Sequence, residues 1–131
     1  MDKRFFSVRE ANEMIPFLTE HLRQIRSERK RLARIARRSL PGFQDIMLRG
    51  GMVVGAEYFD RARHLHGLLA EIGAKGCHIK DLDSGLVDFP TIWEGREVFL
   101  CWKLGEREVA FWHEVDTGFA GRQPLKSDRE N

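Results

Sequence analysis

Cysteine is scarce in this sequence, with two residues among 131. Cys77 and Cys101 stand singly, without a partner at the spacing of a metal motif or a redox pair. A disulfide-stapled scaffold needs a dense set of paired cysteines, so that class is excluded. We expect two reduced thiols in a cytoplasmic protein.

Long apolar runs and nucleotide-binding glycine patterns are also missing. No run approaches the ~20 residues that span a bilayer, so we expect no membrane association. The first six residues, MDKRFF, are too short and too soon polar to predict a signal peptide. There is no dinucleotide-type glycine pattern and no P-loop, so no cofactor is expected.

Charge is spread unevenly behind a net value of +2. Residues 20–39 carry eight Lys and Arg against two Glu, whereas residues 76–131 carry seven basic and eleven acidic residues. A basic and an acidic element in one chain can neutralise each other. We favour this interpretation over a basic surface for nucleic acid or lipid.

The length and the 42% share of hydrophobic residues suit one globular domain. We predict a single α+β domain over residues 1–125. It comprises a helical region at 7–73, a β-meander at 77–116 and a C-terminal loop at 116–125. A flexible tail is expected at 126–131.

The helical region opens with a capping box, in which Ser7 and Glu10 satisfy each other's backbone amides. Apolar residues then recur at three- and four-residue steps, which predicts a long helix to about Ser39. Pro16 lies inside this pattern. It should kink the helix or mark the first turn of a second segment after a short one.

The tripeptide Leu40-Pro41-Gly42 is predicted to end this helix, and a second helix follows from about Met52 to Ile72. Together they form a helical hairpin that packs on the sheet. The first helix would be ~50 Å long, more than a compact domain of this size needs. Its apolar stripe predicts a partner, and we expect a homodimer through the long helices.

The β-region predicts four antiparallel strands in a meander. Turns are expected at Asp83-Ser84-Gly85, at Glu94-Gly95 and at Gly105-Glu106, the last as a type II′ turn. Two registers follow from these turns.

Phe89 should face Leu100, and Val98 should face His113. The second of these registers, with Val98 opposite His113, places His113 at the margin of the apolar face that covers the helices. Asp88 is expected on the second face.

Candidate ligand-binding residues gather on that second face. Lys80 is expected opposite Asp88, with Cys101 beside it on the next strand and Trp112 nearby. A lysine, a carboxylate and a thiol can hold a small molecule or supply acid–base groups. A surface salt bridge worth under ~1 kcal/mol explains the same pattern, and we favour it.

His113 and Asp116 combine side-chain types that bind zinc, manganese or iron. Glu114 points to the opposite face, so a third ligand would have to come from Asp81 or Cys77 across the sheet. We therefore expect no metal. A buried His113 that holds the Asp116 loop by a hydrogen bond is the favoured interpretation.

The C-terminal loop contains two glycines, a hydrophobic anchor in Phe119 and a lone Arg122. Glycine-rich backbone beside an arginine can bind phosphate or carboxylate. A structural loop, with Arg122 paired to Asp116 or another acid of the sheet, explains the same residues and is favoured.

A basic stripe follows the first helix at three- and four-residue steps. Its members are Arg23, Arg26, Lys30, Arg34 and Arg37. Such a stripe predicts salt-dependent, non-specific nucleic-acid binding, but no aromatic residues interleave it for base stacking. We favour a solvated or acid-paired face over nucleic-acid binding for this stripe.

A capped helix with Glu10-Ala11-Asn12 near its start precedes a series of motifs between residues 79 and 124. They read IKDL, GLVDFP, GREV, LCW, LGE, WHE and DTGFAGRQP. In these motifs the chain resembles the Domain of Unknown Function 2203 family, which consists of small uncharacterised prokaryotic proteins. The resemblance implies the fold and a cytoplasmic compartment, and it implies no activity.

The leading functional hypothesis is a non-enzymatic interaction module that self-associates through its long helices, with another protein partner as a further option. The alternative is a small-molecule or anion-binding protein, or an enzyme, that uses the outer sheet face and the C-terminal loop. The candidate residues of this alternative are Lys80, Asp88, Trp112, His113, Asp116 and Arg122.

Overall fold

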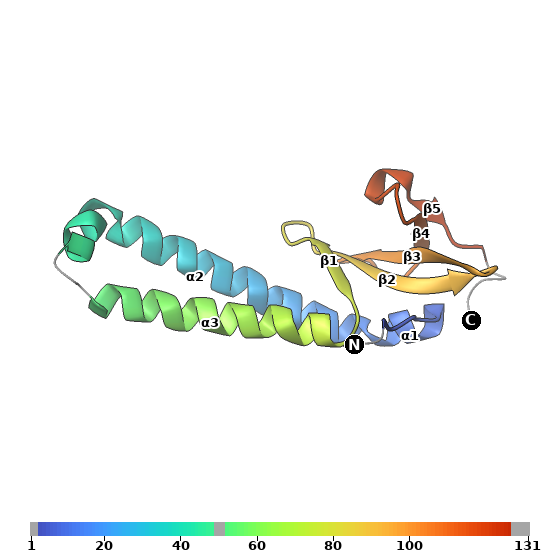
Figure 1. Cartoon of the computed structure of the whole chain (residues 1–131), viewed down its shortest axis with the longest axis horizontal. Coiled ribbons are helices and arrows are strands. Elements are labelled where there is room, and N and C mark those ends of the chain that lie inside the picture. The colour runs from blue at the N-terminus through green and yellow to red at the C-terminus, as the bar shows by residue number, and fades with distance from the viewer. Residues whose placement is uncertain (1–2, 49–51, 127–131) are drawn as a thin grey trace. The chain divides into compact units, whose positions relative to one another are not determined.

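The computed structural model describes residues 3–48 and 52–126 (Figure 1). Within these ranges the chain combines helices with an antiparallel sheet, which confirms the α+β class. The elements are α1 (Val8–Glu13), α2 (Ile15–Leu48), α3 (Met52–Ala74), β1 (His78–Asp81), β2 (Leu86–Trp93), β3 (Arg96–Lys103), β4 (Phe111–Glu114), the 3₁₀ helix η1 (Phe119–Gly121) and β5 (Gln123–Pro124). None of the described helices is both long enough and apolar enough to cross a membrane.

Two compact units make up the chain. The sheet unit contains residues 1–22 and 71–131, and the helical unit contains residues 23–70. Both α2 and α3 contribute residues to each unit. The single domain expected over residues 1–125 stays a prediction.

The start of the helical region matches its sequence signature. Ser7 Oγ accepts a hydrogen bond from the Glu10 amide at 3.1 Å, and Glu10 Oε1 accepts one from the Ser7 amide at 2.8 Å. This reciprocal pair confirms the capping box. Helix α1 ends at Glu13, and Pro16 lies in the first turn of α2, where its missing amide removes no helical hydrogen bond.

The predicted helix end at Leu40-Pro41-Gly42 is wrong, because α2 continues to Leu48. A proline removes one i→i−4 hydrogen bond and can bend a helix without ending it. The ribbon changes direction near the C-terminal end of α2 (Figure 1), as a bend of this kind predicts. The second helix, Met52–Ala74, is close to its predicted span.

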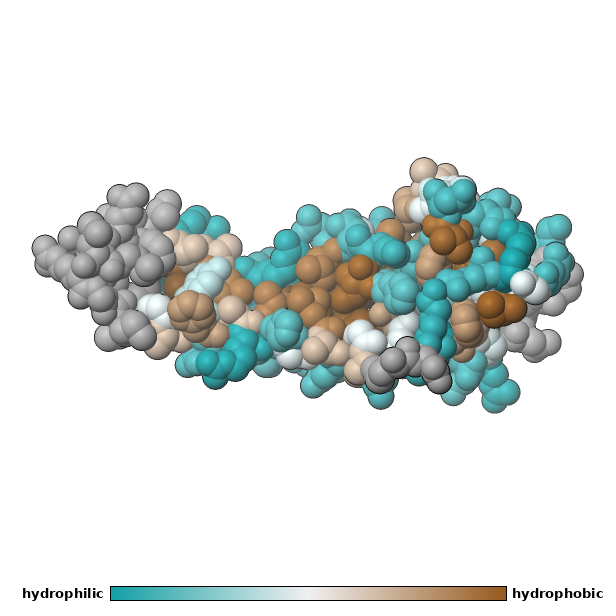
Figure 2. Space-filling view, viewed as in Figure 1, coloured by the Kyte–Doolittle hydropathy of each residue, from teal (hydrophilic) through white to brown (hydrophobic). Residues whose placement is uncertain are grey.

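In the helical unit, ion pairs connect α2 to α3. Glu28 Oε1 lies 3.4 Å from Arg61 Nη1, and Arg38 Nη2 lies 3.8 Å from Glu57 Oε2. The buried apolar residues of this unit include Ile25, Leu32, Ile35 and Leu68. Other apolar side chains are exposed among polar ones along these helices (Figure 2).

The sheet has five strands in the order β1-β2-β3-β4-β5, with every neighbouring pair antiparallel. The sequence predicts a meander of four strands, and the structure has a fifth, β5, which forms inside the expected C-terminal loop. The β2–β3 register is as predicted, with Phe89 opposite Leu100. Positive φ angles at Glu94 (53°) and Gly95 (77°) fit a two-residue type I′ turn between these strands.

The predicted β3–β4 register is wrong by one residue. Phe99 lies opposite His113, whereas the sequence predicts Val98 there. The expected two-residue turn at Gly105-Glu106 does not form, because the Glu106 amide donates to the Lys103 carbonyl at 2.9 Å and β4 begins only at Phe111. A one-residue shift moves every side chain to the other face, so His113 joins Asp88.

The segment between β3 and β4 is held by side chains. Trp102 Nε1 donates to the Glu106 carbonyl at 3.0 Å, and the Val109 amide donates to Asn12 Oδ1 at 2.6 Å. Asn12 belongs to α1, so this bond fixes the segment to the N-terminal helix within the sheet unit.

The first face of the sheet carries an apolar core. Its fully buried members on the two central strands are Val87, Phe89, Val98, Leu100 and Trp102. Phe6 packs edge-on against Phe89 at 5.2 Å between ring centroids, and the Phe6 amide donates to the Pro90 carbonyl at 2.7 Å. Residues of β2 and β3 are buried on both faces, which leaves the second face shielded from solvent as well.

Candidate metal centre

The second face differs from its prediction at β1. His78 lies opposite Asp88, in the place predicted for Lys80. The connection from β1 to β2 is longer than the predicted three-residue turn, because β1 ends at Asp81 and β2 begins at Leu86. Ser84 Oγ donates to Asp81 Oδ2 at 2.6 Å within this connection, and the register shifts between Ile79 and Asp81. Lys80 is exposed, and its Nζ lies 5.5 Å from the Phe99 ring centroid.

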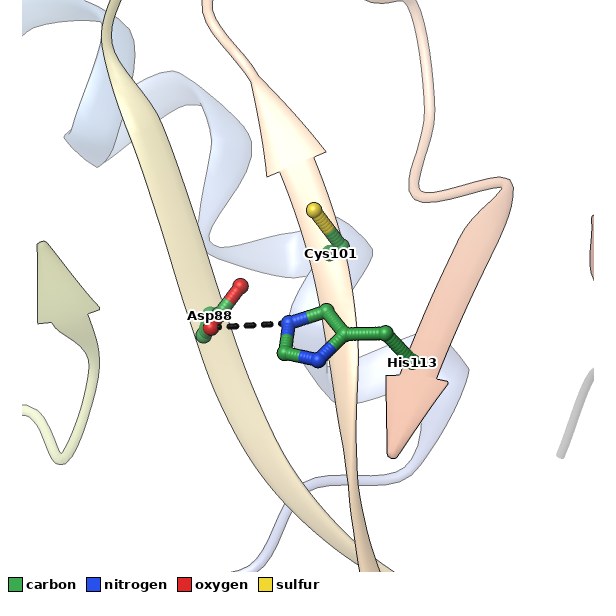
Figure 3. A group of neighbouring side chains, drawn as sticks. All are labelled: Asp88, Cys101 and His113. Carbon is green, nitrogen blue, oxygen red and sulfur yellow. Dashed lines mark hydrogen bonds and ion pairs between the residues drawn. The ribbon is translucent and has the colours of Figure 1, made fainter. Parts of the chain in front are cut away.

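Three side chains meet on this face from three consecutive strands. Asp88 belongs to β2, Cys101 to β3 and His113 to β4, and Figure 3 shows them converging on one space. One potential ligand atom from each residue lies within 4.8 Å of the others. The residues are 1%, 0% and 2% exposed, so the group is enclosed by protein.

The hydrogen bonds of His113 define where its protons lie. Nδ1 is 2.7 Å from the Glu114 carbonyl oxygen, which can only accept, so Nδ1 carries a hydrogen. Nε2 is 2.9 Å from Asp88 Oδ2. One proton must lie between these two atoms, either on the imidazole or on the carboxyl group.

Two polar atoms near this group lack a hydrogen-bond partner among the described residues. They are Asp88 Oδ1 and Arg122 Nε, and both are buried. An unsatisfied buried polar atom costs about 1–3 kcal/mol, and more when the group is charged. Besides His113, the neighbour of the Asp88 carboxyl group in this cluster is the Cys101 thiol.

Cys101 is a neutral thiol at ordinary pH. Burial raises the pKa of Cys101 to about 11, the charge of Asp88 adds to this effect, and Arg122 opposes it. Neither imidazole nitrogen of His113 is placed to take the thiol proton, because one faces Glu114 and the other faces Asp88. This geometry does not activate Cys101 as a nucleophile.

Aromatic rings surround the group. The Phe99 ring lies 5.5 Å from the imidazole of His113 and 5.7 Å from that of His78. Burial, and then the charges of Lys80 and Lys3, lower the pKa of His78. His78 thus stands at the border of the site as a neutral ring at neutral pH.

Arg122 approaches Cys101 from the C-terminal segment. Its guanidinium lies 3.9 Å from the Phe111 ring centroid and 5.0 Å from that of Phe119, and Nη2 donates to Glu106 Oε1 at 2.5 Å. Phe111 is the β4 partner of Cys101, which brings the guanidinium beside the thiol. Arg122 thus forms an ion pair with an acidic residue, as predicted, and that residue is Glu106. Asp116, the other predicted partner, is exposed.

The six residues predicted to form one ligand site therefore do not all lie together. Asp88 and His113 come together, with Arg122 close to their neighbour Cys101. Trp112 lies opposite Leu100, on the other face, and packs against Trp93 at 5.3 Å. Cys101 lies opposite Asp88, as the predicted β2–β3 register places it beside the candidate group, although it is not among the six residues proposed to bind a ligand.

His113 Nε2 and Asp88 Oδ2 lie at nearly the spacing of two zinc ligands. In a tetrahedral zinc site, nitrogen and oxygen ligands lie roughly 3.3 Å apart. The distance of 2.9 Å between His113 Nε2 and Asp88 Oδ2 is somewhat shorter, so the hydrogen bond would open slightly as an ion replaced its proton. The Glu114 carbonyl fixes the imidazole through Nδ1, as outer partners of metal-binding histidines do.

A cleft of about 480 Å³ lies elsewhere in the sheet unit. Its lining includes Asn12, Val109 and Leu125 and none of the three clustered residues. The cluster is therefore an enclosed group of potential ligands and does not form the floor of that cleft.

Comparison with known proteins identifies the family of this chain but assigns it no activity. No curated protein and no solved structure matches the chain. The model of the family described as "Uncharacterized conserved protein (DUF2203)" matches residues 4–125, nearly the whole sequence. The chain belongs to this family of uncharacterised conserved proteins, DUF2203.

Proposed function

We propose that this protein binds a divalent transition-metal ion, of the zinc class, through Asp88, Cys101 and His113. The observation that carries the proposal is the convergence of a carboxylate, a thiol and an imidazole within 4.8 Å in the interior of the sheet unit. The unpartnered Asp88 Oδ1 supplies a further acceptor.

Charge balance favours ion entry. In the metal-free state, one proton lies between Asp88 and His113, and another lies on the Cys101 thiol. A divalent cation that binds Nε2, a carboxylate oxygen and Sγ displaces both protons. Two positive charges enter and two leave, so the interior gains no net charge.

The donor set indicates which ions fit. Thiolate and imidazole ligands select zinc and other transition metals, whereas magnesium and calcium prefer oxygen ligands alone. Three protein ligands leave a fourth position, which in zinc sites is taken by water or by a bound molecule.

The test is a zinc titration of protein previously freed of metal with a chelator, in competition with a chromophoric chelator. We expect one ion per chain. At a free-ion concentration 100 times the dissociation constant, the free energy of unfolding should rise by ~2.7 kcal/mol.

The matched variant is the double substitution of Asp88→Asn and His113→Gln, which keeps side-chain size and removes two ligands. Stoichiometric zinc binding that survives in this variant would place the ion elsewhere. Wild-type protein that takes up no zinc would refute the proposal.

Self-association through the helices is the second candidate function. Tyr58 and Phe59 on α3 are 41% and 67% exposed, and their rings pack edge to face at 6.4 Å. Two adjoining exposed aromatic rings are suited to an interface with a second copy. Sedimentation at micromolar concentration should show a dimer that Phe59→Ser weakens, and a monomer in the wild type would exclude it.

A further inference from the structure

A cleft of about 190 Å³ opens between α2 and α3 in the helical unit. Its lining residues are Arg31, Arg34, Ile35, Arg38, Glu57 and Arg61. Arginines from both helices thus face one space. The basic stripe read from the sequence follows α2 alone and shares only Arg34 with this cleft.

Carboxylates neutralise only part of this charge. Glu28 Oε1 lies 3.3 Å from Arg31 Nη1, 3.4 Å from Arg61 Nη1 and 3.7 Å from His64 Nδ1. Glu57 pairs with Arg38 at 3.8 Å. Four guanidinium groups against two carboxylates leave an excess of two positive charges at the cleft, without counting His64.

Two of the cleft's arginines, Arg31 and Arg61, are ion-paired with a buried carboxylate. The Glu28 side chain, 5% exposed, pairs with both of them, and Ile35 of the cleft lining is buried. Arg34 has no ion-pair partner among the side chains that the structure describes. Its guanidinium is therefore free to meet a ligand that the other arginines orient.

We infer that this cleft binds a small phosphorylated ligand through its phosphate group. A guanidinium presents paired N–H donors that match two oxygens of a phosphate, and several such groups around one concave space recognise a compact anion. The cleft spans two helices and has the size of a small anionic group. A nucleic-acid backbone, in contrast, would follow the stripe along α2. This inference is independent of the metal centre.

The experiment is a calorimetric titration of the full chain with inorganic pyrophosphate at fixed ionic strength. We expect saturable binding of one anion per chain that weakens as chloride increases. Replacement of Arg34→Gln should weaken binding about tenfold, the effect of losing a hydrogen bond to a charged group. Arg34 is exposed, so this variant should keep its thermal unfolding midpoint.

The matched control is Arg63→Gln, which removes the same charge from α3. Arg63 has an 80% exposed side chain, pairs with Asp60 and does not line the cleft. Its pyrophosphate affinity should equal that of the wild type. A second variant, Arg61→Lys, keeps the charge and loses the paired donors, and it should bind several-fold more weakly.

Three outcomes would overturn the inference. They are an absence of saturable binding, equal losses in the Arg34 and Arg63 variants, and tight binding of random duplex DNA that depends on Arg23 and Arg26 and is unaffected by Arg34→Gln. The last result would assign the basic charge to the stripe along α2.

Discussion

Asp88 and His113 meet across the strand that separates them, with His113 Nε2 2.9 Å from Asp88 Oδ2. Asp88 comes from β2, His113 from β4, and Cys101 of the intervening β3 completes the group. The contact joins strands that are not neighbours in the sheet. It is a buried hydrogen bond in this structure, and the proposed ion would use both side chains as adjacent ligands.

The Asp88–His113 contact should be strongly coupled in stability. Removing the carboxylate with Asp88→Ala leaves a buried imidazole without its partner, and we expect a loss of about 3–5 kcal/mol in the free energy of unfolding. Combining it with His113→Leu should recover part of that loss. Urea denaturation of all four proteins in chelator measures this coupling, and strictly additive losses would contradict the contact.

Cys101 should be a metal ligand and Cys77 should not. Both thiols are buried, and burial raises the pKa of each to about 11, which makes Cys77 a matched control. Protein loaded with cobalt(II) should show a sulfur-to-cobalt charge-transfer band. The band should persist in Cys77→Ser and disappear in Cys101→Ser, and the reverse pattern would reject the assignment.

Metal affinity should increase with pH. Because its pKa is raised to about 11, the Cys101 thiol keeps its proton throughout the neutral range and must release it when an ion binds. Each displaced proton makes the apparent affinity rise about tenfold per pH unit. Competition titrations with zinc at pH 6.5 and 7.5 measure the change, and equal affinities would show that the thiol is not a ligand.

Asn12 should stabilise the segment before β4. Its Oδ1 accepts the hydrogen bond of the buried Val109 amide, so Asn12→Ala leaves that donor unsatisfied. We expect a loss of about 1–3 kcal/mol in unfolding free energy, measured by urea denaturation. Glu13→Ala, at an exposed neighbouring position of α1, is the control and should change stability little.

Local rules predicted much of the fold. The Ser7 capping box formed as expected, and the tight turn at Glu94-Gly95 fixed the β2–β3 register. Asp88 therefore lies opposite Cys101 as the sequence indicates. In both cases the determining residues are close together in the chain, so no distant contact had to be known.

The β4 register was mispredicted because one of the bonds that hold the preceding segment joins residues far apart in the chain, Asn12 and Val109. Gly105 resembles the first residue of a type II′ turn, yet the bonds from Trp102 to Glu106 and from Val109 to Asn12 hold an irregular segment there. That segment shifts β4 by one residue and brings His113 to the face of Asp88. The cluster could not be predicted without knowledge of this segment. Successive side chains of a strand point to opposite faces of the sheet, so a one-residue error in the register places every side chain of β4 on the wrong face.

The two edges of the sheet constrain how the protein can meet others. β1 has four residues and an irregular register, and β5 has two residues, one of them Pro124, which lacks an amide hydrogen. A long, regular edge would be a template for strand addition and amyloid-like growth. Within the residues that the structure describes, neither edge offers one, so extension of the sheet by an extra strand is disfavoured there.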